Sequence, residues 1–276
     1  MSTAPLQRRQ LTVTAVEQLG AYTVLRAADA DGPEGEGGGR VPHPGQFAML
    51  AAVERWGGGE DERPYLARAF SYARHRDGEA HFLLEDVGPG TRRLCELRPG
   101  ERMWALGPLG RGFRTGGRDL DRRRAILVGG GVGIAPLAIL QDSLEDPATV
   151  LLGFRDRSRA EGAALLREAR VATDDGSAGH HGLVTELLAR ELDHDPRAVV
   201  YACGPAGMLE GVRALCERER VPAQLALEAG MACGYGACFG CVVPRRRGGY
   251  LRVCVDGPVI DAAELDAVEA HAGAPA

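Results

Sequence analysis

The sequence predicts a multidomain protein that joins a β-rich part to an α/β part and a short cysteine-rich tail. Three observations support this fold class. Short apolar runs separated by turn-forming residues fill the chain up to about residue 118, strand-like and helix-like segments alternate between residues 119 and 223, and four of the seven cysteines follow residue 224. A chain of 276 residues also exceeds the ~100–200 residues of a typical domain, so two or three modules are expected.

The first part, residues 1–118, has the pattern of short antiparallel strands. Apolar runs at residues 11–16, 22–27, 46–53 and 80–84 have the length of strands and are bounded by turn-forming residues. Strands of this length at irregular spacing are typical of a small β-barrel or sandwich. The segments 31–39 and 57–61 are rich in glycine and acidic residues, so we expect surface loops there.

The second part, residues 119–223, alternates between the two kinds of secondary structure. Strands are predicted at residues 125–128, 149–154 and 198–202 and helices at residues 135–144, 159–170 and 206–219. Strands that alternate with helices indicate a parallel sheet. The tail, residues 224–276, is expected to end in an acidic helical stretch.

The cysteines of the tail carry the strongest chemical signal. Cys233, Cys238, Cys241 and Cys254 are spaced C-x4-C-x2-C-x12-C. The first three match the spacing of plant-type [2Fe–2S] ligands, and the small residues between them let backbone N–H groups approach the cluster sulfurs. The alternative is a zinc site with four cysteine ligands. Such a site usually brings two C-x2–4-C pairs, and here Cys254 stands alone.

A glycine-rich turn follows the first strand of the α/β part. Residues 129–136 read Gly-Gly-Gly-Val-Gly-Ile-Ala-Pro. Glycines let the backbone approach a pyrophosphate, and Pro136 suits the first turn of a helix whose N–H groups would face the phosphates. Because Ile134 stands where G-x-G-x-x-G has its third glycine, a plain tight turn explains this motif about as well.

Two further motifs gain meaning from their positions. Cys203-Gly-Pro205 follows a predicted strand of the parallel sheet, at the carboxyl edge where ligands bind open sheets. In the first part, Arg68-Ala-Phe-Ser71 precedes Gly90-Thr91 by about twenty residues. An arginine and hydroxyl groups can bind a diphosphate, although an arginine on a strand is usually a solvated surface residue.

Composition excludes several classes of function. The formal net charge of −5 gives no electrostatic footprint for nucleic acid. The first twenty residues do not form a signal peptide. The longest apolar run, residues 125–140, is short for a membrane span of ~20 residues and contains glycines and a proline. We therefore expect a cytoplasmic protein with no membrane partner, whose cysteines are reduced or bind metal.

Together these motifs resemble the ferredoxin–NADP reductase superfamily. Their order along the chain is Arg68-x-x-Ser71, Gly88-x-Gly90-Thr91, Gly107-Pro-Leu-Gly-Arg-Gly-Phe113, the glycine turn, Cys203-Gly-Pro205 and the cysteine-rich tail. The segment from Leu227 to Cys241, followed by Arg252-Val-Cys-Val-Asp-Gly-Pro258, is similar to the cluster signature of the electron-transfer subunits of dihydroorotate dehydrogenase B. The resemblance covers nearly the whole chain.

The resemblance implies three domains and three cofactors. Residues 1–118 would form an FAD-binding antiparallel β-barrel, residues 119–223 a Rossmann-like NAD-binding domain with a parallel sheet, and residues 224–276 a small [2Fe–2S] domain. The implied flavin contacts are Arg68, Ala69, Phe70, Ser71, Leu83, Leu84, Glu85, Gly90 and Thr91. The implied NAD contacts are Gly130, Gly131, Gly133, Ala135, Pro136, Arg155, Asp156, Gly204 and Pro205. Cys203 would align the nicotinamide, and the four tail cysteines would hold the cluster.

The sequence departs from the family pattern at two places. The family usually has a proline where Ala69 stands, which mainly fixes φ. It usually has a Tyr-Arg pair where Leu84 and Glu85 stand, so an aromatic ring and a cation are missing from this strand. For the nucleotide, Asp156 would accept from ribose hydroxyls and repel a 2′-phosphate, whereas Arg155 favours one; the resemblance indicates NAD.

The function that the resemblance implies is electron relay in pyrimidine biosynthesis. A partner subunit with FMN would oxidise dihydroorotate, and this chain would pass the electrons through [2Fe–2S] and FAD to NAD⁺, in a heterotetramer of two subunits each. The alternatives are a relay subunit of a hydrogenase, sulfide dehydrogenase or transhydrogenase complex, an iron–sulfur redox sensor, and a zinc-stabilised binding module.

Overall fold

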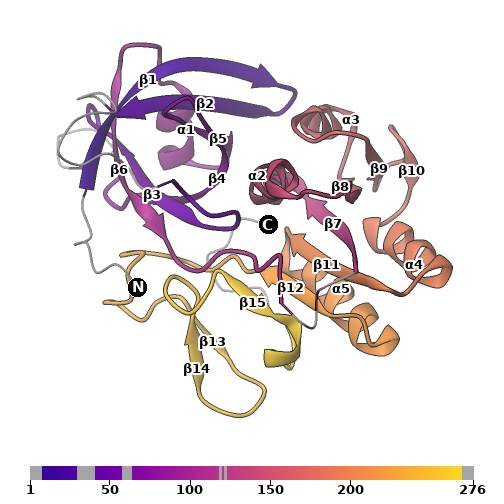
Figure 1. The fold of residues 1–276 in the computed structure, drawn as a ribbon. Helices are drawn as coiled ribbons and strands as arrows, with labels where there is room; N and C mark the ends of the chain where they lie inside the picture. Colours follow the sequence, from indigo (N-terminus) through magenta and orange to yellow (C-terminus); the bar gives the residue numbers. More distant parts are fainter. Residues whose placement is uncertain (1–7, 30–40, 58–63, 118–119, 121–122, 269–276) are drawn as a thin grey trace.

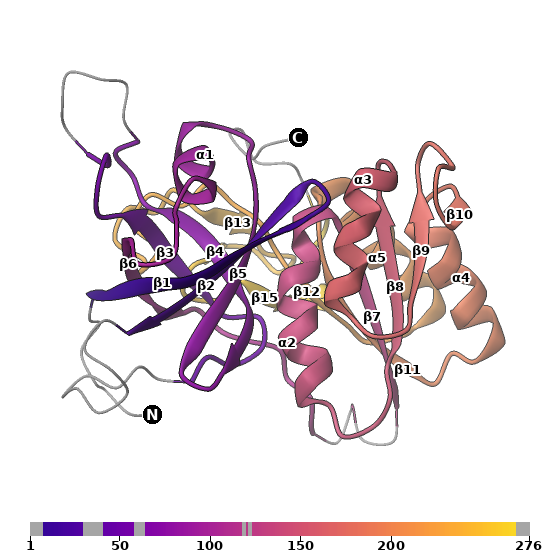
Figure 2. The ribbon, with the colours of Figure 1, turned by 90° about the horizontal axis from the view of Figure 1, so that it is seen from above.

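The computed structural model describes residues 8–29, 41–57, 64–117, 120 and 123–268. Within them, a β-barrel and an α/β domain lie side by side, and the cysteine-rich tail packs along both (Figure 1; Figure 2). The predicted loop 31–39 and most of the loop 57–61 lie outside the described residues.

The first part forms a closed antiparallel barrel. Its strands, in the order β1-β2-β5-β4-β3-β6, are β1 (Arg8–Leu19), β2 (Tyr22–Asp29), β5 (Glu79–Glu85), β4 (Arg68–Arg76), β3 (Phe47–Ala52) and β6 (Arg102–Leu109). The interior is filled by alternating apolar side chains, among them Leu25, Leu50 and Phe82, because successive strand residues point to opposite faces. The predicted barrel is confirmed. A short helix that was not predicted from the sequence, α1 (Pro89–Cys95), begins at the turn before Gly90.

The second part and two strands from the tail form a mainly parallel sheet in the order β10-β9-β8-β7-β11-β12-β15. The strands are β7 (Arg124–Gly130), β8 (Thr149–Phe154), β9 (Ala169–Thr173), β10 (His180–His181), β11 (Ala198–Cys203) and β12 (Ala223–Ala226), with β15 (Val259–Asp261) antiparallel at the edge. One face packs on α2 (Ala135–Ser143) and the barrel, and the other on α4 (Val184–His194) and α5 (Ala206–Glu219). The predicted parallel sheet is confirmed.

The helix predicted at residues 159–170 is wrong over most of its length. A single α-turn, α3 (Arg157–Ala160), passes into the 3₁₀ turn η2 (Glu161–Leu165), and β9 starts at Ala169. Glu168 has a positive φ of 54°, which a helix cannot continue through. Pairing of β9 with β8 therefore decides the conformation of this segment.

The tail contributes β15 and most of β12 to the sheet and has a small hairpin of its own. β13 (Val242–Pro244) pairs with β14 (Tyr250–Arg252), and β15 extends the sheet beyond β12. The acidic helical end is, within the described residues, only the 3₁₀ turn η3 (Ala262–Glu264). We propose domain boundaries near residues 118 and 223. The strands β12, which begins at Ala223, and β15 follow the second boundary and complete the sheet of the α/β domain.

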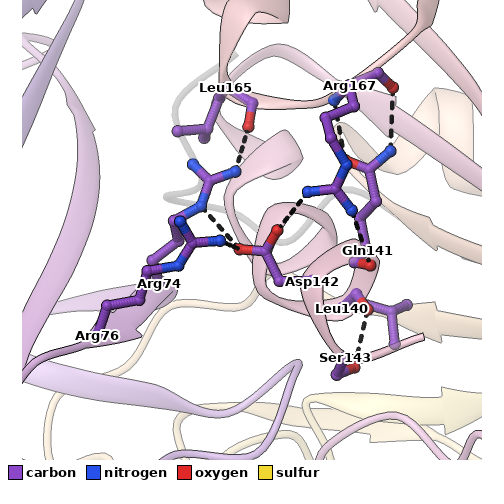
Figure 3. A network of polar contacts seen from close by, with 8 residues as sticks. All are labelled: Arg74, Arg76, Leu140, Gln141, Asp142, Ser143, Leu165 and Arg167. Carbon is purple, nitrogen blue, oxygen red and sulfur yellow. Dashed lines mark hydrogen bonds and ion pairs between the residues drawn. The ribbon is translucent and has the colours of Figure 1, made fainter. Parts of the chain in front are cut away.

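Polar contacts fix the barrel on the α/β domain. Arg74 and Arg76 of β4 both reach Asp142 at the end of α2, with N–O distances of 2.8 and 2.7 Å, and Arg167 binds its other oxygen at 2.7 Å (Figure 3). Arg74 also donates to the carbonyl of Leu165. Burial raises the pKa of Asp142, but the hydrogen bonds from Arg167 and Arg74 outweigh it, so this pKa lies below its ordinary value.

Candidate functional site

A cavity of about 1350 Å³ lies where the barrel, the carboxyl edge of the sheet and the start of the tail meet. This volume exceeds the ~300–1,000 Å³ of a site for one drug-sized ligand. Its wall includes most of the residues that were assigned from the sequence to the flavin and the nucleotide: Arg68, Ala69, Phe70, Ser71, Leu83, Glu85, Gly90, Thr91, Gly130, Gly131, Gly133, Ala135, Arg155, Cys203 and Pro205.

The barrel side of the cavity brings Arg68 onto the turn at Gly90. A Cβ atom on Gly90 would lie 2.7 Å from Nε of Arg68, so only glycine lets the guanidinium lie there. Thr91 Oγ1 accepts from the N–H groups of Val87 and Gly88 at 2.9 and 3.0 Å. This hydroxyl therefore holds the turn in shape, and the arginine beside it lines the cavity.

The neighbouring strand β5 divides its predicted contacts between two faces. Leu83 and Glu85 line the cavity, but the side chain of Leu84 is fully buried in the barrel interior. Because successive strand residues alternate, the Leu84 side chain points away from the cavity, so the flavin contact predicted at Leu84 would have to come from its backbone. Glu85 pairs with Arg159 of α3 at 2.9 Å, and Arg159 also lines the cavity.

The glycine turn packs against the loop at Cys203. A Cβ on Gly133 would lie 2.7 Å from the backbone of Gly204, and one on Gly130 would lie 2.6 Å from Sδ of Met208. The turn thus needs its glycines for close backbone approach, and its surface faces the cavity. Gly204 and Pro136 are not in the cavity wall, because the first packs on Gly130 and the second is buried at the start of α2.

Asp156 does not line the cavity, unlike Arg155. Its carboxylate caps α3, accepting from the backbone N–H of Arg159 at 3.0 Å and from the Arg159 guanidinium at 2.7 Å. These hydrogen bonds hold the pKa of Asp156 below its ordinary value. The acid that was expected to meet ribose hydroxyls is therefore engaged within its own turn.

Cys203 and Glu228 both lie in the cavity wall. Burial, followed by the charge of Glu228, raises the pKa of the Cys203 thiol well above its ordinary value, so the sulfur stays protonated and is no nucleophile. Burial also raises the pKa of Glu228. Glu228 was not predicted from the sequence. Its position two residues beyond β12, at the carboxyl edge of the sheet, is the signal that points to it.

The four tail cysteines form two pairs. Cys241 and Cys254 are buried with their sulfurs 3.2 Å apart, and burial together with Cys241 raises the pKa of Cys254 to about 12. In the other pair, Cys233 sits beside Cys238. Burial raises the pKa of Cys233, but N–H groups of Tyr235 and Cys238 outweigh it and bring the pKa to about 6.

This pairing fits a two-iron centre. Each iron of a [2Fe–2S] cluster takes two protein ligands. The loop also needs its glycines. Gly234 and Gly236 have φ values of 81° and 88°, and a Cβ on either would lie within 2.7 Å of a side-chain atom.

Comparisons with known proteins place the chain in a class and then in a family. Residues 228–266 match the model of the iron-sulfur cluster binding domain of dihydroorotate dehydrogenase B. The structure resembles an NADH-dependent reduced ferredoxin-NADP oxidoreductase (TM-score 0.74, 23% identity, 96% of this chain and 91% of that one) and the ferredoxin reductase of carbazole 1,9a-dioxygenase (TM-score 0.61, 22% identity, 80% and 67%). The fold is that of the ferredoxin reductases.

Proteins of similar sequence identify the family within this fold class. The dihydroorotate dehydrogenase B (NAD(+)) electron transfer subunit of Geobacillus kaustophilus is 40% identical over 234 residues, 80% of this chain and 86% of the relative. That of Caldanaerobacter subterraneus is 36% identical over 232 residues, 82% and 88%. This chain belongs to the family of dihydroorotate dehydrogenase B electron transfer subunits.

None of the helices in the described part of the chain has the length and hydropathy to cross a membrane.

Proposed function

We propose that this chain is the electron-transfer subunit of an NAD-linked dihydroorotate dehydrogenase. The observation that carries the proposal is identity of 40% over 86% of a relative with that name, together with the four paired cysteines in the matched cluster domain. When bound, the cluster carries single electrons, and FAD exchanges them in pairs with the nicotinamide of NAD.

The residues of the chain supply binding and orientation for this chemistry. Arg68 binds the flavin diphosphate, and the glycine turn at residues 130–133 binds the nicotinamide dinucleotide. Cys203 and Glu228 lie where the nicotinamide and flavin rings would meet, and the protonated Cys203 helps to align the nicotinamide. Asp156 stabilises α3, so the preference for NAD over NADP that was assigned to it needs another residue of the cavity wall.

Dihydroorotate itself is oxidised by a partner subunit that contains FMN, in a heterotetramer of two subunits each. The partner would dock on the tail around Gly234–Ala237, because a relay needs the cluster between the two flavins. Three aromatic side chains of the tail are exposed there or on its hairpin: Tyr235 (51%), Phe239 (60%) and Tyr250 (74%). Exposed aromatic side chains are typical anchors of protein–protein interfaces.

The test compares the chain alone with the chain plus its dihydroorotate-oxidising subunit. Alone it should reduce artificial electron acceptors with NADH and show no dihydroorotate-dependent activity. Adding the partner should give dihydroorotate:NAD⁺ activity. Cys238→Ser should abolish that activity, and Cys95→Ser, a half-buried cysteine of α1, should not.

Three outcomes would contradict the proposal. Oxidation of dihydroorotate by the chain alone would contradict its role as a relay subunit. NADH-driven flavin reduction that couples only to a hydrogenase, sulfide dehydrogenase or transhydrogenase partner would assign it to another complex. A chain whose cluster responds to oxidants but whose flavin is not reduced by NADH would be a redox sensor.

A further inference from the structure

An ion pair crosses from the barrel to the nucleotide domain inside the cavity. Glu85, at the end of β5, binds Arg159 of α3, with Oε1 at 2.9 Å from Nη2 and 3.1 Å from Nε. Both side chains are partly buried, with exposed fractions of 20% and 32%, and both line the cavity wall. The second partner of Arg159 is Asp156 on its own turn, at 2.7 Å.

A buried hydroxyl beside this pair has no hydrogen-bond partner. Tyr22 is fully buried, and within the described residues its Oη forms no hydrogen bond. Tyr22 stands directly opposite Glu85 in the β2–β5 pairing. Burial and then the Glu85 charge raise the pKa of its hydroxyl, so Tyr22 remains a donor. An unpaired buried donor is costly, which indicates a second arrangement in which it is satisfied.

The ligands of this cavity give the reason for two arrangements. A nicotinamide dinucleotide brings a pyrophosphate to the glycine turn. A Cβ on Gly131 of that turn would lie 4.0 Å from Oη of Tyr22. The carboxylate of Glu85 would repel the phosphates there, whereas a guanidinium would bind them. Arg159 is tied to the nucleotide domain by Asp156, so it can change its other partner without leaving its place.

We propose that Arg159 is a phosphate-binding residue for the nicotinamide dinucleotide and that Glu85 holds it until the nucleotide binds. The pyrophosphate takes the place of Glu85 on Arg159, and Glu85 then accepts the hydrogen bond of Tyr22. The exchange links nucleotide binding to the contact between the barrel and the nucleotide domain. This inference rests on the proposed function of the cavity and adds the residues that select its ligand.

The test titrates the FAD-loaded chain with ADP-ribose, which carries the pyrophosphate and cannot be reduced, and with adenosine as the phosphate-free control. Arg159→Ala should weaken ADP-ribose binding about tenfold, reduce its dependence on salt, and leave adenosine binding unchanged. Arg157→Ala removes the same charge from the same helix but not from the cavity wall, so its effect should be less than twofold. Glu85→Gln should tighten ADP-ribose binding.

Tyr22→Phe separates the exchange from simple charge attraction. It should weaken ADP-ribose binding two- to fivefold while the Tm of the ligand-free chain stays the same or rises, because only an unpaired hydroxyl is removed. In a Glu85→Ala background the same substitution should have no effect on binding.

Several results would overturn the proposal. The first is an equal loss of ADP-ribose affinity in Arg159→Ala and Arg157→Ala. The second is a lower Tm of the ligand-free chain in Tyr22→Phe. The third is loss of FAD from Arg159→Ala with unchanged ADP-ribose affinity, which would assign Arg159 to the flavin. If Arg159→Ala does not fold, Arg159→Gln replaces it. The titration needs no partner subunit, so failure of the dihydroorotate assay would not affect its result.

Discussion

Asp142 carries the contact between the two large domains, and its replacement by asparagine is a direct test of that contact. The carboxylate binds three arginines, Arg74 and Arg76 of β4 and Arg167 of its own domain, at distances of 2.7 to 2.8 Å (Figure 3). An asparagine side chain at this position would keep one acceptor oxygen but turn an NH₂ group toward a guanidinium. At least one of the three arginines would therefore lose its ion pair with residue 142.

The expected loss follows from how deeply each pair is buried. The Arg76 and Arg167 side chains are 56% and 59% exposed, so each pair contributes under ~1 kcal/mol. The pair with Arg74, at 17% and 16% exposure, has the geometry of a buried charged hydrogen bond, which contributes ~1.5–3 kcal/mol. We expect a total of ~2–3 kcal/mol. With an unfolding entropy of ~2.1 cal/mol/K per residue, this lowers the Tm by about 3–5 °C.

The assay is thermal unfolding of the FAD-loaded chain, with Asp146→Asn as the control, because Asp146 is exposed just beyond α2. The folded pKa of Asp142 is below its unfolded value, so the stabilisation is complete above about pH 5 and is lost as pH falls through the folded pKa. The Tm difference should therefore be smaller at pH 4 than at pH 7. A shift at pH 7 no larger than that of the control would refute the reasoning.

Three further predictions concern the cofactors. Cys238→Ser should lose the [2Fe–2S] absorbance and iron while keeping the flavin; stoichiometric zinc without iron in anaerobically prepared wild-type protein would contradict the two-iron assignment. Arg68→Ala should weaken FAD retention by roughly tenfold to a hundredfold through lost charge-assisted hydrogen bonds, measured by flavin release, and recovery of FMN alone from the wild-type chain would show that the ligand is misassigned. NADH should give a higher kcat/KM than NADPH in flavin reduction, and the opposite ranking would reverse the nucleotide assignment.

The parts of the fold that could be predicted from the sequence depend on local pattern. Helix α5 was predicted at residues 206–219 and forms there, because its apolar positions repeat with a helical period between a glycine-proline start and a left-handed Arg220. The cluster cysteines could also be assigned from the sequence, because Cys233, Cys238 and Cys241 are spaced within one short loop and Cys254 follows the next hairpin. The same reasoning failed at residues 159–170, where pairing with β8 determines the conformation.

The side chains that depend on domain docking could not be found in this way. Glu85 and Arg159 are 74 residues apart, and Arg74 and Asp142 are 68 apart. From its own segment alone, each of these arginines would be assigned to the solvated surface. Asp156 was likewise predicted to bind ribose, because the sequence does not show that it caps α3. A pattern read along one strand or helix contains no information on which other domain it faces.

The two ion-pair sites of the docked domains differ in a way that bears on function. Asp142 is held by three arginines, and Arg74 also donates to a backbone carbonyl. If one of these partners were exchanged, the remaining ones would still hold Asp142 and Arg74 in place. Glu85 has one arginine, lines the cavity, and stands opposite a buried hydroxyl that has no partner among the described residues. The first site therefore fixes the position of the barrel on α2. The second can change partners when an anion enters, while the relative position of the two domains is kept.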